Sequence, residues 1–129
     1  RKGSPHWTWA AAVIIFLVIA WLSSGPKLPT GAETSPSPQA IALMDSPHFA
    51  AASQVVQTRC AMCHTAVPGW EGVSEAPKNV ILDSNVAIAN RAHDIAIQAG
   101  YSRAMPPGNV TEMTDDERAL LVAWFRDAR

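Results

Sequence analysis

An uncharged apolar run near one end constrains this 129-residue chain more than any other feature. The run covers residues 7–22 and is interrupted only by Thr8. A helix over residues 5–24 would be about 30 Å long at 1.5 Å per residue, which matches the hydrocarbon core of a bilayer. Its tryptophans lie where interfacial aromatic belts belong: Trp7, Trp9 and Trp21. We therefore predict one membrane-spanning helix within residues 1–25.

Two other interpretations of this run are a cleaved signal peptide and a buried helix of a soluble protein. The tryptophans, and the lack of an A-x-A cleavage pattern after the run, favour a retained span. Arg1 and Lys2 precede the run and only Lys27 closely follows it, so the positive-inside rule predicts a cytoplasmic N-terminus. Because the chain opens with Arg rather than Met, we expect a fragment or a processed C-terminal part of a longer polypeptide.

The residues after the run divide into a linker and one small domain. Half of the ten prolines fall between Pro26 and Pro47, so we predict a semi-extended tether over residues 26–45 and a single domain over residues 46–129. Lys and Arg total 10 against 11 Asp and Glu, with no basic block. This balance gives no electrostatic footprint for a nucleic acid, which we exclude as a partner.

Residues Cys60, Cys63 and His64 form the pattern C-x-x-C-H, the attachment sequence of a c-type heme. Two thiols at this spacing reach the two vinyl groups of one porphyrin, and the adjacent histidine binds the iron from the same turn. A zinc site would need further ligands, and the chain has no other cysteines. A thioredoxin-like pair would need a βαβ context, and a plain disulfide leaves His64 unexplained. We therefore predict one covalent heme c. Attachment on the outer side of the bacterial inner membrane places the domain in the periplasm.

A low-spin heme iron needs a sixth ligand besides His64. Met62 lies within the attachment turn and is geometrically excluded. Met105 lies in Ala-Met-Pro-Pro-Gly-Asn, where two prolines stiffen the loop and a glycine lets the backbone approach closely. We predict that Met105 is the second axial ligand. The rivals are Met113, otherwise an apolar core contact, and His93, otherwise a surface histidine.

Helical periodicity and capping signals predict three helices and no strand in the domain. The first has Pro47 at its first position and delivers the two thiols. The second covers residues 83–99 and is ended by Gly100, and the third opens with a capping box at Thr114. With so few residues, an all-α domain of this kind needs the cofactor as part of its core. We therefore expect the apoprotein to be poorly folded.

From residue 46 onwards these motifs together resemble class I monoheme cytochromes c. The resemblance implies the class I cytochrome c fold, with three main helices around one heme. It also implies that the carbonyl of Pro77 accepts a hydrogen bond from the His64 ring, with Pro68 as the runner-up, and that Trp124 packs near the heme edge. Met/His ligation with the iron enclosed on both sides predicts an electron carrier with no direct small-molecule substrate.

The segments SEAPKNVILD and AMPPGNVTEMTDDERALLVAW, with a preceding span, resemble the C-terminal cytochrome domain of membrane-bound bacterial urate oxidases. That resemblance implies electron transfer from a fused membrane oxidase domain, or another redox partner protein, to the respiratory chain. This chain alone is then a carrier, and the longer polypeptide an enzyme. The alternative is a heme-based sensor or peroxidase with a displaceable sixth ligand. Three cations could rim an exposed heme edge and meet an acidic patch of a partner: Lys78, Arg91 and Arg103. The net charge of −1 favours the alternative that they lie on an ordinary solvated surface.

Overall fold

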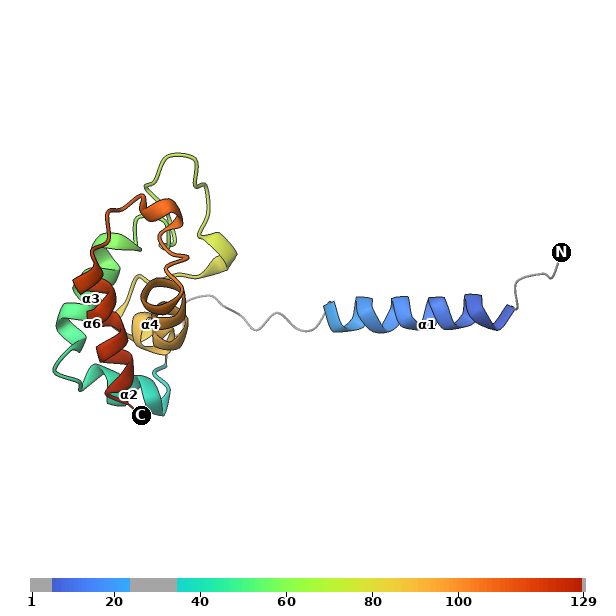
Figure 1. Cartoon of the computed structure of the whole chain (residues 1–129), viewed down its shortest axis with the longest axis horizontal. Helices are drawn as coiled ribbons and strands as arrows, with labels where there is room; N and C mark the ends of the chain where they lie inside the picture. The colour runs from blue at the N-terminus through green and yellow to red at the C-terminus, as the bar shows by residue number, and fades with distance from the viewer. Residues whose placement is uncertain (1–5, 24–34, 129) are drawn as a thin grey trace.

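The structure is a computed structural model that describes residues 6–23 and 35–128 (Figure 1). The described residues are mostly helical and include no strand, which confirms the all-α prediction at that level. The elements are α1 (His6–Ser23), α2 (Pro38–Met44), α3 (Phe49–Arg59), η1 (Pro77–Asn79), α4 (Asn85–Asn90), α5 (Ala92–Ile95), η2 (Ala96–Tyr101), η3 (Pro107–Asn109) and α6 (Asp115–Arg126).

Helix α1 is the predicted apolar helix. Its 18 residues have a mean hydropathy of 1.8 and none of them is buried within the structure. The large side chains are exposed along its whole length, including Trp7 at 70% and Trp21 at 75%. By length and composition the helix is able to cross a membrane, a test that a signal sequence near the N-terminus also passes.

Helix α2 corrects the predicted extent of the linker. We expected a semi-extended tether through residue 45, but residues 38–44 form a helix. The side chains of Ala40 and Leu43 in this helix are fully buried. The Ser37 hydroxyl accepts a hydrogen bond from the Ala40 backbone N–H, and Pro38 occupies the first turn, where its missing N–H is tolerated. Pro38, one of the prolines that suggested an extended chain, therefore lies at the start of a helix. The first part of the tether, residues 26–34, lies outside the described residues.

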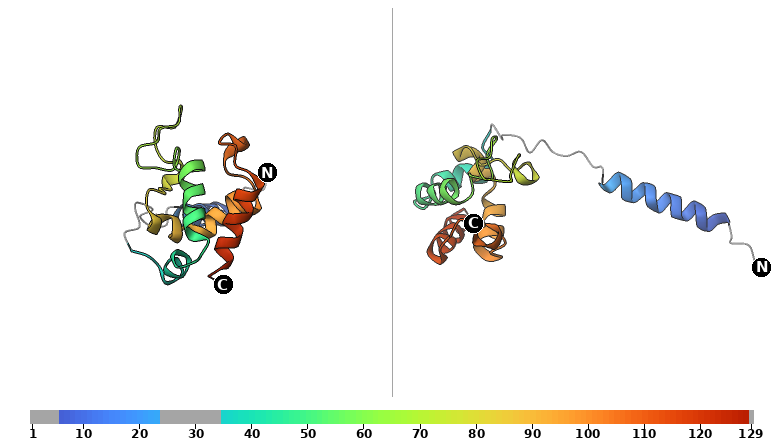
Figure 2. Two further views of the ribbon diagram at one scale, coloured as in Figure 1. Left: turned by 90° about the vertical axis from the view of Figure 1, so that its left-hand side faces the viewer. Right: turned by 90° about the horizontal axis from the view of Figure 1, so that it is seen from above.

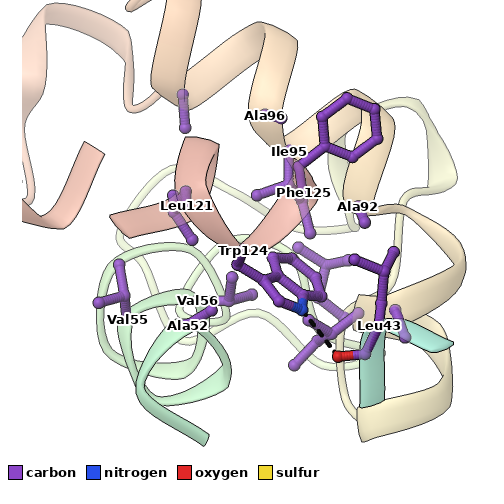
Figure 3. Close-up of a cluster of buried hydrophobic side chains, with 14 of the residues drawn as sticks. Leu43, Ala52, Val55, Val56, Ala92, Ile95, Ala96, Leu121, Trp124 and Phe125 are labelled. Carbon is purple, nitrogen blue, oxygen red and sulfur yellow. Dashed lines mark hydrogen bonds between the residues drawn. The ribbon is translucent and has the colours of Figure 1, made fainter. Parts of the chain in front are cut away.

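Helices α3 and α6 pack together and form one side of the core (Figures 1 and 3). Helix α3 starts two residues later than predicted and buries Ala52 and Val56 on one face. Helix α6 begins at the predicted capping box, in which Thr114 and Glu117 each accept a hydrogen bond from the other's backbone N–H. The acidic first turn also complements the helix dipole.

The predicted middle helix is broken into three pieces, α4, α5 and η2. Ser84 caps α4 as expected, but the backbone leaves helical geometry at Arg91, with φ −99° and ψ 10°. The last piece is a wider π-type turn that runs past Gly100 to Tyr101. Gly100 therefore does not end the helix. A side chain there would collide with α6, because an added Cβ would lie 2.5 Å from Val122 Cγ2.

The packed elements form two neighbouring groups around the core (Figure 2). Helix α2 packs mainly against α4, and α6 packs mainly against η2 and α3. The segments that follow α3 and η2 are loops and short turns, at the end of the domain away from α2 (Figure 1). These two loops carry the residues that the sequence singled out.

Candidate cofactor site

A cavity of about 480 Å³ lies between the segment after α3 and the loop before α6. This volume is within the range of about 300–1,000 Å³ that is usual for cofactor pockets. The wall is mainly apolar, and it includes Leu82, Ile95 and Ala99. Five of the predicted site residues line it directly: Cys60, Cys63, His64, Pro77 and Met105.

The attachment turn closes the C-terminal end of α3. The backbone N–H groups of Cys63 and His64 both donate to the carbonyl of Cys60, at 3.1 and 2.9 Å. Both cysteines are free thiols and both are half-buried at the cavity wall. The two sulfurs and the imidazole therefore project from one tight turn, as the spacing predicts.

The surroundings of Cys60 disfavour the ionised, thiolate form of its side chain. Burial, and next the neighbouring Cys63, raise its pKa to about 11, although the positive charge of Arg118 acts in the opposite direction. Reactive cysteines of thiol–disulfide pairs have lowered pKa values instead. The environment of Cys60 thus gives no support to a thioredoxin-like redox pair.

The His64 ring is held by a backbone carbonyl, but not by the one implied by the resemblance. Its Nδ1 lies 3.0 Å from the carbonyl oxygen of Val80, not from that of Pro77 or Pro68. Lys78 and Asn79 both have φ near 54°, so the chain turns sharply after Pro77. This turn directs the carbonyl of Val80, instead of that of Pro77, towards the His64 ring. A carbonyl only accepts, so Nδ1 carries the proton and Nε2 keeps a lone pair for a metal.

Met105 is half-buried at the cavity wall, in the irregular loop between η2 and α6. Neither of its rivals lines the cavity. Met113 is 3% exposed within the hydrophobic core, as expected for an apolar contact. The His93 side chain is 67% exposed and its ring packs edge-on against Phe125. Among the sulfur and imidazole candidates, His64 and Met105 are the two on the cavity besides the cysteines.

Trp124 lies elsewhere than the resemblance implied. It is fully buried in the core and is not among the residues that line the cavity. Its indole N–H donates to the carbonyl of Leu43 at 3.0 Å (Figure 3). The centroid of its ring lies 5.9 Å from that of Phe49. Because α2 supplies a carbonyl at this point, Trp124 is directed away from the cavity and towards α2.

Two of the three predicted rim cations line the cavity, Lys78 and Arg91. Arg103 does not line it and forms an exposed ion pair with Asp115 at 3.0 Å.

Sequence reasoning missed Arg59, which lines the cavity and donates to the carbonyl of Thr111 at 2.7 Å. Arg59 also pairs with Glu117 at 3.0 Å. Despite desolvation, hydrogen bonds from the Thr114 backbone and from Arg59 lower the pKa of the Glu117 carboxyl.

The chemistry of the cavity wall matches that of a porphyrin. Thr111 lines the cavity, but its hydroxyl is buried within the wall and has no hydrogen-bond partner among the described residues. A porphyrin has an apolar macrocycle for the apolar wall and propionate oxygens for the cations at the wall, Lys78 and Arg91. The residues present therefore fit a heme.

The described residues do not gather three or more His, Cys, Asp or Glu side chains that could hold a bare metal ion. The zinc interpretation of the cysteine pair gains no support from them. No protein-family description, curated protein or solved structure matches the chain. Any functional conclusion therefore rests on the residues and the geometry of this cavity.

Proposed function

We propose that this chain is a membrane-anchored c-type cytochrome of the class I fold that carries single electrons. The observation that carries the proposal is the convergence of two free thiols, one tautomer-fixed imidazole and one thioether on a single apolar cavity. The thiols of Cys60 and Cys63 would hold heme c through two thioether bonds. His64 and Met105 would be the axial ligands.

Heme c, when bound, supplies the one-electron Fe(II)/Fe(III) couple. The chain's own residues do the rest. The carbonyl of Val80 keeps the His64 ring in one orientation, and the apolar wall excludes water, which favours the less charged ferrous state. With His64 and Met105 both holding the iron, no position on it would be left for a substrate.

Helix α1 and the sequence resemblance support a location for this carrier. Helix α1 would anchor the domain to the bacterial inner membrane, with the N-terminus cytoplasmic and the domain periplasmic. The resemblance to urate oxidases supports a fused membrane oxidase domain as the electron donor. The respiratory chain would be the acceptor, through a redox partner protein.

Expression of the full chain with periplasmic heme attachment, followed by purification in detergent, tests this proposal. We expect covalent heme that survives acid–acetone extraction, a reversible one-electron titration, and no rapid binding of carbon monoxide by the reduced form. The double variant Cys60→Ala, Cys63→Ala should lose the covalent heme. Rapid carbon monoxide binding by the wild type would contradict electron transfer and favour a sensor or a peroxidase.

A further inference from the structure

We infer that Arg118 is a positioning residue that holds the Met105 loop against the cavity and so keeps the methionine at the iron. The inference rests on the proposed function, because it assigns a task to a residue behind the proposed sixth ligand. Arg118 lies in α6 and is not itself part of the cavity wall. It acts through the backbone of the loop.

The side chain of Arg118 is buried against three acceptors. The residue is 5% exposed, and its guanidinium donates to the carbonyl oxygens of Ala99 at 2.6 Å and Met105 at 2.9 Å. A third bond reaches the Asn109 side-chain oxygen at 2.8 Å. All three are uncharged, and Arg118 has no ion pair with a carboxylate among the described residues.

This arrangement is unusual for a buried charge. A buried cation is ordinarily paired with an anion, because desolvation is otherwise uncompensated. Here the charge is compensated only by oriented carbonyl and amide dipoles, so each of the three bonds carries much of the compensation. The planar fork of an arginine spans the three acceptors, whereas a lysine ammonium is a single point. The site is therefore specific for arginine.

The three acceptors belong to the segments that set the position of Met105. Ala99 lies in η2, before Met105 in the chain, and Asn109 lies in η3, after it. The N–H of Met105 donates to the carbonyl of Gln98 at 2.9 Å, while its carbonyl accepts from Arg118. Both polar groups of the residue that bears the thioether are thus fixed, one by η2 and one by α6.

Asn109 extends the clamp along the loop. Besides accepting from Arg118, its side chain exchanges two hydrogen bonds with the backbone of Met113, both at 3.1 Å. The Arg118 guanidinium therefore joins the loop to α6, and the Asn109 amide joins that guanidinium to the backbone of Met113. Movement of the loop away from the cavity would break bonds to a buried charge, so these bonds oppose any displacement of the Met105 backbone.

The test measures how easily imidazole displaces the methionine in the ferric, heme-loaded full chain, using loss of the weak far-red absorption band. We compare Arg118→Lys with Asn109→Gly, which removes the amide but tolerates the φ of 55° at that position. Arg126→Gln is the control, because it removes an exposed arginine from the same helix. Thermal unfolding of each variant is recorded alongside.

We expect Arg118→Lys to lose the band at about a tenfold lower imidazole concentration, and Asn109→Gly to shift in the same direction. Arg126→Gln should behave as the wild type. Melting temperatures that fall while both variants keep the wild-type imidazole titration would overturn the inference, since Arg118 would then be merely structural. If Arg118→Lys does not accumulate with heme, the Asn109→Gly titration decides. A wild type without the band would refute Met105 ligation itself, and with it the role of Arg118.

Discussion

Trp124 is the largest fully buried side chain among the described residues, and its indole N–H donates to a carbonyl of α2 (Figure 3). The bond to Leu43 joins the C-terminal helix to a segment expected to be linker. The indole bond therefore adds to the packing of α2 against α4, which includes residues 38–44 in the domain. The same contact explains why a tryptophan expected at a heme edge lies in the core instead.

The variant Trp124→Phe keeps an aromatic ring but removes the N–H donor. The Leu43 carbonyl then keeps its bond from the Ser46 backbone N–H but loses the bond from the indole, so we expect a loss of about 0.5–1.5 kcal/mol in the free energy of unfolding of the heme-loaded chain. Chemical denaturation measures this loss. Phe49→Leu, at the half-buried ring beside Trp124, is the comparison. An unchanged stability in Trp124→Phe would show that the bond does not hold α2 in place.

Among the elements, the close crossing of η2 and α6 depends on Gly100. An added Cβ would lie 2.5 Å from the branched side chain of Val122, which has little freedom to move away. We expect Gly100→Ala to destabilise the heme-loaded chain by about 1–3 kcal/mol, as overpacking does. Gly69→Ala is the matched control, because nothing lies within 4 Å of a Cβ at that position. Equal melting temperatures for the two variants would refute this reason for the glycine.

Local sequence patterns predicted some of the elements and not others. The apolar helix, the cap at Thr114 and the attachment turn are local, and each was predicted from neighbouring residues. The break at Arg91 and the identity of the carbonyl that holds His64 were not predicted. They depend on tertiary packing and on two residues with positive φ, which spacing does not reveal.

Arg118 was missed for a different reason, although a signal was present. It lies three residues before Leu121 and seven before Phe125, on the buried face of α6. A charged residue in the apolar stripe of a helix is a sequence-level sign of a buried polar contact. The acceptors could not have been named, because they come from η2 and the loop after it.

Across the whole molecule, the C-terminal residues are tied to the junction of α2 and α3. The carboxylate of Asp127 accepts from the Ser46 hydroxyl and lies 2.8 Å from Nδ1 of His48. The Ser46 bond, followed by that of His48, lowers the pKa of the Asp127 carboxyl from 3.8. Because the folded chain then binds fewer protons than the unfolded chain, this contribution to stability is present above about pH 4. It is lost as the pH falls through the lowered pKa.

We therefore expect Asp127→Asn to have a lower melting temperature than the wild type at neutral pH. The difference should vanish below the lowered pKa, where the wild-type carboxyl is protonated. Melting curves between pH 2 and pH 7 measure this, with the exposed Asp45→Asn as control. A difference that is the same at every pH would show that the carboxylate charge plays no part.

The cavity sets the stability of the molecule without its cofactor. Without an occupant, the mainly apolar wall of the cavity is left in contact with water, and apolar surface in water costs about 25 cal/mol per Å². A domain of this size has a stability of only about 5–15 kcal/mol, so the loss of a bound porphyrin removes a large share of it. The double variant Cys60→Ala, Cys63→Ala, purified without heme, should lose cooperative unfolding and near-ultraviolet circular dichroism. A sharp, native-like transition in this heme-free chain would contradict a cofactor-filled core.

We propose that His64 and Met105, which line the same cavity, would together hold one heme iron. The most direct measurement is the optical spectrum of the oxidised full chain, recorded for the wild type, Met105→Ala and the matched control Met113→Ala. We predict a far-red methionine band in the wild type and in Met113→Ala, and its loss in Met105→Ala. A wild type without the band, or a band that survives in Met105→Ala, would contradict the ligand assignment.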